Sequence, residues 1–355
     1  MPDPFNSPFI SCEMSQEGDG IIGNLMADLT YTNPVYSGYF ADPFVWQHEG
    51  IYYAVGTGPV PDRSDSKLAE LRAFPLLRSH DFVNWESIGG ALRVPDFAVG
   101  GDFWAPEVAF DNGKFYLYYS VSTEGLNHKL RVAVSSSPEG PFEDVGLLMP
   151  HSDDVPFAID AHPFRDDDGQ WYLFYARDFL DQENGLFAGT ALVVDRLLNM
   201  TILAGEEKVV VRARNNWTLF KAQREMYGKI LDWHTLEGPF VRKHEGEYFC
   251  FYSGGCYENE SYGVDYAVGS SVMGPYADSG NETGARVLKT LAEKVIGPGH
   301  HSIAVGPDGR DYLVYHAWDH AMTGRRMCID LLLWTEEGPR CAGPTWASQT
   351  ISASS

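Results

Sequence analysis

The chain has 355 residues, of which 44% are hydrophobic and 14% aromatic, and its formal net charge at pH 7 is -23. A chain of this length can bury a large core, either as one large domain or as two ordinary ones. An acidic surface repels nucleic acid and anionic lipid, so both are excluded as expected partners. A neutral oligosaccharide or polysaccharide is compatible with this charge. Nothing in the sequence indicates an oligomeric state.

The first twenty residues contain neither the basic segment nor the apolar run of a secretory leader. No apolar run elsewhere is long enough to span a bilayer. The five cysteines form no Cys-x-x-Cys pair, which excludes a zinc ribbon and a thioredoxin-like site. We therefore expect reduced thiols, no membrane association and a cytoplasmic location, or a secreted protein only if a leader has been removed.

Short β-branched and aromatic segments, interrupted by Gly, Asn, Asp and Pro, dominate the chain and indicate strands. The sequences DNG at 111–113 and HEG at 48–50 and 244–246 are typical of hairpin turns, because glycine tolerates positive φ. Only the segments 64–74 and 289–295 show helical periodicity.

Five segments repeat one outline, in which an aromatic strand, a glycine turn and a second aromatic strand follow each other. They are 43–57 (PFVWQHEGIYYAVGT), 107–120 (EVAFDNGKFYLYYS), 163–176 (PFRDDDGQWYLFYA), 239–253 (PFVRKHEGEYFCFYS) and 302–318 (SIAVGPDGRDYLVYHAW). Repeated four-stranded units around an axis form a β-propeller, so five repeats predict an all-β, five-bladed β-propeller. A β-sandwich with similar hairpins is the alternative.

The expected domain organisation is simple. We expect residues 1–33 to form an N-terminal arm that packs on the propeller, and residues 34–355 to form a single catalytic propeller domain. The short sequence after the last repeat is too small for another domain.

A carboxylate precedes three of the repeats: Asp42 in ADPF, Asp160 in IDAHPF and Glu237 in LEGPF. A nearby proline holds the backbone extended, which gives each acid a set direction. In a propeller the equivalent strands converge on one pocket, so these acids become neighbours. Carboxylates close together in apolar surroundings take different pKa values and divide into an acid and a base. Two such groups are the minimum required for glycoside cleavage.

The ordered set ADPFV, FWAPEV, IDAHPF, EGPF and GPGHHS resembles glycoside hydrolase family 43 across nearly the whole chain. The resemblance implies a five-bladed propeller and hydrolysis with inversion at furanosides or xylosides. It assigns Asp42 as the general base, Glu237 as the general acid, and Asp160 as the residue that orients Glu237 and raises its pKa. For inversion, the acid and the base are expected to lie about 6.5–9.5 Å apart.

The resemblance also implies substrate-binding residues. Trp104 in FWAPE is expected to pack near the sugar, with a core tryptophan as the alternative, and Phe44 in ADPF to contact the substrate. Arg325 in TGRRMC is expected to bind sugar hydroxyls, with the adjacent Arg326 as the alternative. Glu107 in the FWAPE motif is expected to be structural or to support the site from behind.

His300 in GPGHHS matches the family histidine on the channel axis, which is implied to contact the substrate and to coordinate a calcium ion largely through water. His301 is a weaker candidate. A lone histidine is more often a hydrogen-bonded structural residue, and calcium prefers oxygen ligands.

The leading hypothesis is a glycosidase that cleaves α-L-arabinofuranosidic bonds in arabinan or in oligosaccharides derived from it. A β-D-xylosidase, or an enzyme with both activities, is the alternative, and an endo-acting arabinanase is also compatible. The related sucrose and fructan hydrolases require an Asn-Asp-Pro-Asn-Gly type opening, from which FADPFV departs. A carbohydrate-binding propeller without catalysis is the non-enzyme alternative.

Overall fold

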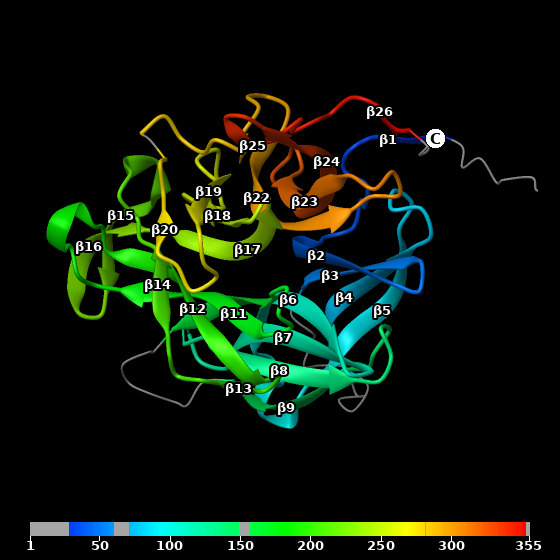
Figure 1. Cartoon of the computed structure of the whole chain (residues 1–355), viewed down its shortest axis with the longest axis horizontal. Helices are drawn as coiled ribbons and strands as arrows, with labels where there is room; N and C mark the ends of the chain where they lie inside the picture. Colours follow the sequence, from blue (N-terminus) through cyan, green and yellow to red (C-terminus); the bar gives the residue numbers. More distant parts are fainter. Residues whose placement is uncertain (1–27, 60–70, 126, 149–156, 281, 353–355) are drawn as a thin grey trace, which may run out of the picture.

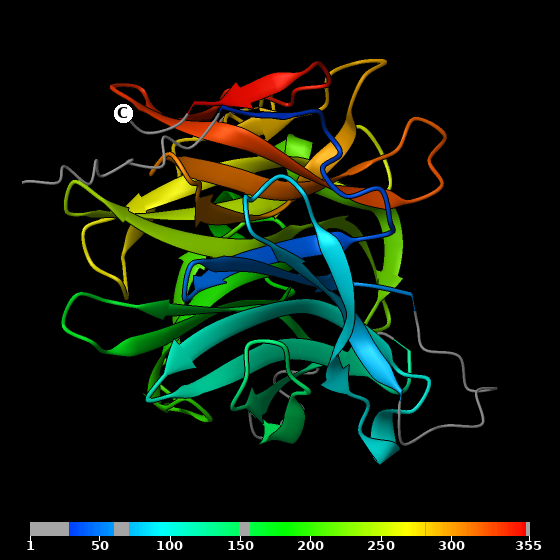
Figure 2. The ribbon, with the colours of Figure 1, turned by 90° about the vertical axis from the view of Figure 1, so that its right-hand side faces the viewer.

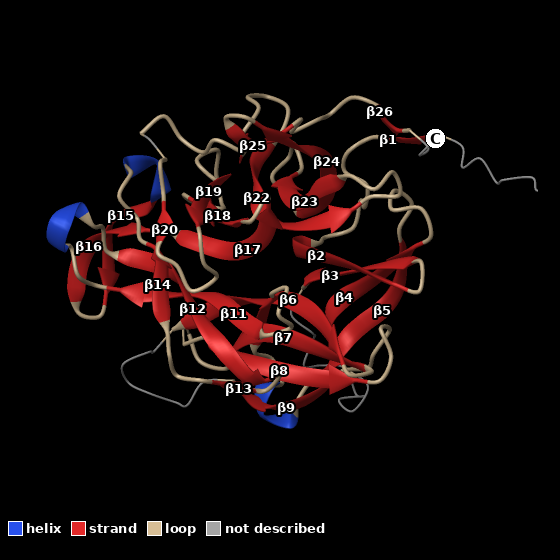
Figure 3. Ribbon diagram, viewed as in Figure 1, coloured by secondary structure: helices blue, strands red, loops and turns tan. Residues whose placement is uncertain are grey.

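The computed structural model describes residues 28–59, 71–125, 127–148, 157–280 and 282–352 (Figure 1). In these residues the fold is all-β, and the sheets are arranged around a common centre like the blades of a propeller. Colouring by secondary structure shows how little of the chain is helical (Figure 3).

Helix in the described residues is limited to three short 3-10 segments, at Asp96–Ala98, Glu183–Gly185 and Asn216–Thr218. None of the helices in this part of the chain has the length and apolar character needed to cross a membrane.

The described residues form five sheets of four or more strands and one two-stranded pair. The first sheet contains β2 (Ala41–His48), β3 (Ile51–Thr57), β4 (Arg72–Ser79) and β5 (Glu86–Arg93). The second contains β6 (Asp102–Asp111), β7 (Lys114–Ser122), β8 (Lys129–Ser135) and β9 (Glu143–Leu147). The third contains β10 (Ala158–Arg165), β11 (Trp171–Phe179), β12 (Gly189–Asn199), β13 (Ile202–Leu203), β14 (Lys208–Val211), β15 (Leu219–Met226) and β16 (Lys229–His234).

The fourth sheet contains β17 (Leu236–His244), β18 (Glu247–Gly254), β19 (Gly263–Gly269), β20 (Tyr276–Ala277) and β21 (Leu288–Lys289). The fifth contains β22 (Ile296–Val305), β23 (Asp311–Trp318), β24 (Arg325–Thr335) and β25 (Gly338–Cys341). The predicted repeats therefore correspond to the first two strands of the five larger sheets in the described residues.

The predicted hairpin turns are confirmed. The pairs β2–β3, β6–β7 and β17–β18 are antiparallel and turn at residues 49–50, 112–113 and 245–246. Both residues of each turn have positive φ. This geometry matches the right-handed twist of the flanking strands, which is why glycine occupies the second position each time.

The predicted helices are wrong where the structure describes them. Residues 72–74 belong to β4, residue 289 ends β21, and residues 291–295 form a turn closed by an isolated bridge between Leu291 and Val295. The remainder of the first predicted helix, residues 64–70, lies outside the described residues. Strand pairing on the sheet overrode the local helical preference at 72–74, as tertiary context commonly does.

The two ends of the described chain meet. β1 (Leu29–Tyr31) pairs antiparallel with β26 (Gln349–Ile351), and the two strands lie side by side at the upper edge of Figure 2. Residues 1–27 of the expected N-terminal arm lie outside the described residues, so the division at residue 33 stays a prediction.

The first strands of the five larger sheets contact one another in a closed cycle. β2 contacts β6, β6 contacts β10, β10 contacts β17, β17 contacts β22, and β22 contacts β2. Apolar side chains fill the space between neighbouring sheets. Between the first and fifth sheets, for example, Val45 and Leu77 pack with Val314 and Ile329 in one buried cluster.

We call these five first strands the inner strands. The regular pairing of each inner strand with the second strand of its sheet is interrupted at an equivalent position. The pairing register with the second strand shifts there in all five sheets, as in a β-bulge. One residue in each interruption has positive φ, and we call these five the bulge residues: Asp42 (50°), Ala105 (45°), Asp160 (61°), Gly238 (54°) and His300 (43°).

Four bulge residues donate a backbone N–H to a side chain of the preceding sheet in the cycle. The donor and acceptor pairs are Asp42 and His316 Nδ1 (3.1 Å), Ala105 and Thr57 Oγ1 (2.8 Å), Gly238 and Asp160 Oδ2 (2.8 Å), and His300 and Ser253 Oγ (2.8 Å). An amide freed from its ladder by a bulge needs another partner when it is buried. These bonds therefore fix the inner strands to one another at the level of the bulges.

Candidate active site

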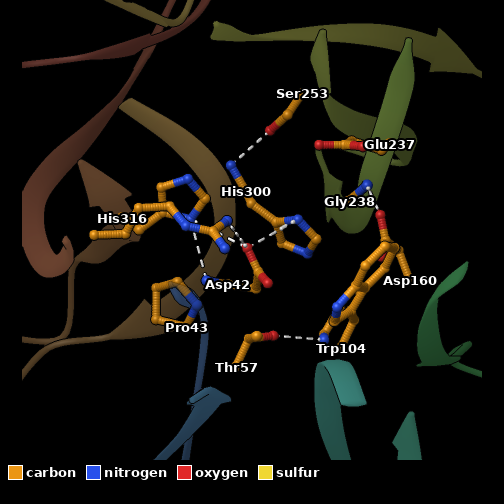
Figure 4. Close-up of polar contacts among 12 residues, drawn as sticks. Asp42, Pro43, Thr57, Trp104, Asp160, Glu237, Gly238, Ser253, His300 and His316 are labelled. Carbon is orange, nitrogen blue, oxygen red and sulfur yellow. Dashed lines mark hydrogen bonds and ion pairs between the residues drawn. The ribbon is translucent and has the colours of Figure 1, made fainter. Parts of the chain in front are cut away.

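Six of the seven site residues predicted from the sequence line one cavity of about 120 Å³ at the level of the bulges. Figure 4 shows how Asp42, Trp104, Asp160, Glu237 and His300 lie relative to one another. The complete lining is Asp42, Trp104, Ile159, Asp160, Glu237, Tyr257, His300 and Arg325. These residues come from all five larger sheets, so only closure of the cycle brings them together.

The three carboxylates reach the cavity from two kinds of position on their strands. Asp42 and Asp160 are bulge residues, whereas Glu237 precedes the bulge residue Gly238. A Cβ at Gly238 would lie 3.2 Å from the ring of His300, and φ is positive there. Glycine is therefore favoured at 238, and the longer side chain of Glu237 supplies the carboxylate from one residue earlier.

Asp42 is surrounded by cationic and hydrogen-bonding groups. Its Oδ1 lies 3.2 Å from Arg325 Nη1 and 3.4 Å from His300 Nδ1. Burial alone would raise the pKa of this carboxyl, but His300, Arg325 and His316 together hold it well below its usual value. Burial also lowers the pKa of His300. Arg325 is therefore the permanent positive charge that keeps Asp42 ionised.

Arg325 is fixed in place on the other side. Its Nη2 donates a hydrogen bond of 3.0 Å to Tyr39 Oη, and its guanidinium lies 5.0 Å from the ring centre of Tyr257. The alternative, Arg326, instead forms an ion pair of 2.9 Å with Asp319 and does not line the cavity. Of the two adjacent arginines, the structure brings Arg325 to the site.

Asp160 and Glu237 form a pair that retains a proton more readily than isolated carboxyls do. Burial, followed by the charge of Glu237, raises the pKa of Asp160 well above its usual value, although Gly238 N–H donates to Asp160 Oδ2. Burial raises the pKa of Glu237 to about 7, and the nearby charge of Asp42 acts in the same direction. Tyr262 Oη opposes this by donating to Glu237 Oε1 at 2.5 Å.

Trp104 forms a wall of the cavity and is held from behind. Its ring stacks on His128, with ring centres 3.5 Å apart and an angle of 21° between the planes. Burial lowers the pKa of His128 to about 4, so a neutral imidazole supports the indole near neutral pH. This arrangement leaves Trp104 only partly buried.

Phe44 does not line the cavity, which corrects its prediction as a substrate-binding residue. Phe44 is two residues beyond the bulge, where side chains pack between the inner strands, and its aromatic ring lies 6.5 Å from that of Phe240.

Glu107 is at the equivalent position of β6 and accepts a hydrogen bond of 2.7 Å from His162 Nδ1. Val241 N–H donates to His162 Nε2 at 3.0 Å, which places the imidazole proton on Nδ1. Glu107 therefore contacts His162 and does not line the cavity, which agrees with the expected supporting role.

The sequence reading missed His316, Tyr262 and His128. A signal for His316 was present, because it occupies the place in its repeat that Thr57 and Ser253 occupy in theirs. All three side chains accept a bulge amide of the next sheet. Tyr262 and His128 lie between the repeats and carry no comparable pattern.

The described residues around His300 offer no set of direct ligands for the predicted calcium ion, and its coordination through water stays a prediction. No three or more His, Cys, Asp or Glu side chains of the described ranges are grouped so that they could hold a metal ion. Calcium prefers oxygen ligands, and the Asp42 carboxylate near His300 already pairs with Arg325. His301 is buried beside aromatic rings.

Comparison with known proteins gives a consistent result. A model of the family described as Glycosyl hydrolases family 43 matches residues 31–339. The chain is 26% identical over 347 residues to the beta-D-galactofuranosidase xynD of Aspergillus niger. The matched region covers 92% of this chain and 88% of that protein. The chain is 27% identical over 318 residues to the extracellular endo-alpha-(1->5)-L-arabinanase 1 of Bacillus subtilis, covering 84% of this chain and 86% of that protein. The crystal structure of a thermostable family-43 glycoside hydrolase matches with a TM-score of 0.75 and 32% identity, covering 92% of this chain and 99% of that one.

These relatives overturn the prediction of a cytoplasmic protein. The Bacillus subtilis arabinanase is named as extracellular, and so are arabinofuranosidases from Streptomyces avermitilis and Cellvibrio japonicus that match at 27% and 28% identity. The prediction rested on the absence of a leader pattern in the first twenty residues, which lie outside the described residues.

The hydrogen bond from Tyr262 gives a prediction about the acid. Tyr262→Phe removes a donor that favours the ionised form of Glu237, so the pKa of Glu237 is expected to rise above about 7, by about one pH unit. Carbon-13 NMR titration of labelled glutamate carboxyls measures this directly. Tyr257→Phe is the matched control, because Tyr257 lines the same cavity without a hydrogen bond to Glu237. An unchanged or lower pKa in Tyr262→Phe would contradict the assignment of this bond.

Proposed function

We propose that this chain, which belongs to glycosyl hydrolase family 43 and is a glycosidase, hydrolyses α-L-arabinofuranosidic bonds in arabinan or in oligosaccharides derived from it, with inversion of configuration. The observation that carries this proposal is the meeting of Asp42, Asp160 and Glu237 in one cavity with pKa values displaced in opposite directions. The non-enzyme alternative is set aside, because the chain is a glycosidase. We also propose that the five larger sheets are the five blades of a closed propeller.

Asp42 acts as the general base in this proposal. Because Arg325 keeps its carboxylate ionised, it can accept a proton from a water molecule near neutral pH. The water oxygen then attacks the anomeric carbon from the face opposite the leaving group, and the bond from this carbon to the glycosidic oxygen breaks. The sugar consequently leaves with the inverted configuration.

Glu237 acts as the general acid. Burial raises its pKa to about 7, so a substantial fraction is protonated near neutral pH. It donates this proton to the glycosidic oxygen as the bond breaks, which releases the leaving group as an alcohol. Asp160 supports the acid, because it accepts a hydrogen bond from the amide of Gly238, the residue next to Glu237.

Arabinofuranosides are proposed as the substrate because several relatives are named as arabinanases or arabinofuranosidases, including those of Bacillus subtilis and Cellvibrio japonicus. Two other names support alternatives. The Aspergillus niger relative is a beta-D-galactofuranosidase, and a Bacteroides ovatus relative is a xylosidase/arabinosidase.

The substrate assignment is tested with the wild-type protein on 4-nitrophenyl α-L-arabinofuranoside, β-D-xyloside and β-D-galactofuranoside. We expect kcat/KM to be at least about tenfold higher for the arabinofuranoside, a difference of 1.4 kcal/mol in transition-state binding. A higher value for either other glycoside would transfer the assignment to that sugar while leaving the acid and the base in place.

The roles of the two carboxylates are distinguished by the leaving group. Glu237→Ala is expected to lower kcat on arabino-oligosaccharides by about 10²–10⁴-fold, and much less on 4-nitrophenyl arabinofuranoside, whose leaving group needs no proton. Asp42→Ala is expected to lower both rates strongly, because every substrate requires the activated water. Steady-state kinetics on the two substrates measure the difference.

Glu245→Ala serves as the matched control for these variants. Glu245 is an exposed carboxylate in the turn between β17 and β18, the same strand pair that presents Glu237. Its removal should leave both rates unchanged. Undiminished turnover of oligosaccharides by Glu237→Ala would show that another group is the acid.

A further inference from the structure

The side chains two residues beyond the five bulge residues form a layer of their own along the inner strands. We call it the second layer, and its members are Phe44, Glu107, His162, Phe240 and Ser302. Four of these side chains are buried, and that of Glu107 is 12% exposed. None of them lines the cavity that contains the three carboxylates. The polar members of the second layer therefore make their contacts with other inner strands and not with the cavity.

His162 binds the inner strand of Asp160 to the inner strand of Glu237. Its Nε2 accepts a hydrogen bond of 3.0 Å from the amide of Val241. The amide of Gly238 donates to Asp160 Oδ2 at 2.8 Å. β17 is therefore bound to β10 at two places, one and four residues beyond Glu237. Because both amides are buried, the loss of either acceptor would leave a buried donor without a partner.

Glu107 fixes the imidazole of His162 in the state that this hydrogen bond requires. Nε2 can accept the amide hydrogen of Val241 only when the ring proton is on Nδ1. Nδ1 lies 2.7 Å from Glu107 Oε2, which accepts a hydrogen bond from this proton. A carboxylate of the second sheet therefore sets the tautomer of a histidine in the third sheet, and this histidine holds an amide of the fourth.

Ser302 makes an equivalent hydrogen bond from the fifth sheet to the first. Its Oγ accepts from the amide of Val45 at 3.3 Å. Like Val241, Val45 lies three residues beyond a bulge residue. The two second-layer bonds are therefore of one kind, but they hold different strands. The bond from Ser302 holds the strand of Asp42, which is the base of the proposed mechanism.

We propose that His162 and Glu107 are positioning residues for Glu237, and that they hold β17 where the acid can reach the glycosidic oxygen. This inference rests on the proposed function, because it takes Glu237 as the general acid. Proton transfer requires the acid to lie within hydrogen-bond distance of the atom it protonates. A displacement of about 1 Å can lower a rate by about 10²-fold. Loss of this hold should therefore weaken protonation of the leaving group and spare the activation of water.

The test compares kcat on an oligosaccharide with kcat on the 4-nitrophenyl glycoside of the same sugar, chosen as whichever sugar the wild-type protein cleaves. The double variant Glu107→Leu, His162→Phe replaces both polar partners by apolar groups, which destabilises less than removing one of them. Phenylalanine already occupies two other positions of the second layer. We expect kcat on the oligosaccharide to fall at least about tenfold. On the nitrophenyl glycoside, whose leaving group needs no proton, it should fall less than about threefold.

Single variants at Glu107 give the same comparison with His162 in place. Glu107→Ala should lower the ratio of the two kcat values, oligosaccharide over nitrophenyl glycoside, by at least about threefold. Glu107→Gln retains an oxygen acceptor for Nδ1–H and should restore the ratio to within about twofold of the wild type. An unchanged ratio in the double variant or, if that variant does not fold, in Glu107→Ala overturns the proposal. A glutamine variant as impaired as the alanine variant also overturns it.

Ser302→Ala is the matched control for the strand that is affected. It removes a second-layer bond to the strand of Asp42, so kcat should fall by the same factor on both substrates. Every substrate requires the activated water, whereas only the oligosaccharide requires the acid. A loss confined to the oligosaccharide in Ser302→Ala would show that the effect does not belong to the strand of Glu237, and would contradict the proposal.

Nitrogen-15 NMR of the histidine rings tests the hydrogen bonds without a substrate. In the wild-type protein His162 is expected to carry its proton on Nδ1, and in Glu107→Ala the form protonated on Nε2 is expected to appear. A wild-type ring protonated on Nε2 would overturn the proposal whatever the kinetics. Undiminished turnover of oligosaccharides by Glu237→Ala would instead contradict the acid assigned under the proposed function, and would leave the NMR result as it is.

Discussion

The site depends on one backbone constraint, a residue with positive φ at the same point of five inner strands. Each interruption turns a peptide out of the ladder with the second strand, and in four cases the freed amide donates to the preceding sheet. Non-glycine residues adopt this conformation at a cost of about 1–2 kcal/mol each. Asp42, Ala105, Asp160 and His300 sustain that cost because the surrounding hydrogen bonds and packing leave no other conformation.

Neighbouring charges then give similar buried carboxyl groups different pKa values. Asp42 and Glu237 line the same cavity, but only Asp42 lies against the guanidinium of Arg325, at 3.2 Å. Its pKa is low, whereas burial and neighbouring carboxylates raise the pKa values of Asp160 and Glu237. A base and an acid can therefore coexist at one pH.

The repeats predicted the sheets and the identity of the three carboxylates, since hairpin turns and alternating strands leave a strong local pattern. Other features depend on contacts between distant segments. The sequence offers no sign that Glu237 precedes its bulge, that Phe44 turns into the ring, or that β16 meets β12 through Gly189 alone. In the segment 289–295 a local pattern was misleading, because the sequence has helical periodicity but forms the end of a strand and a turn. The β15–β16 hairpin of the third sheet was not predicted either, because it belongs to none of the repeats.

The stereochemistry of the released sugar tests the central claim most directly. Proton NMR of the first product formed from an α-L-arabinofuranoside, recorded before the anomers equilibrate, identifies the face that water attacked. The account predicts the β anomer first, because Asp42 activates water directly on the face opposite Glu237. Release of the α anomer first would mean that a carboxylate had formed a covalent intermediate, and the assignment of Asp42 as a base would be wrong.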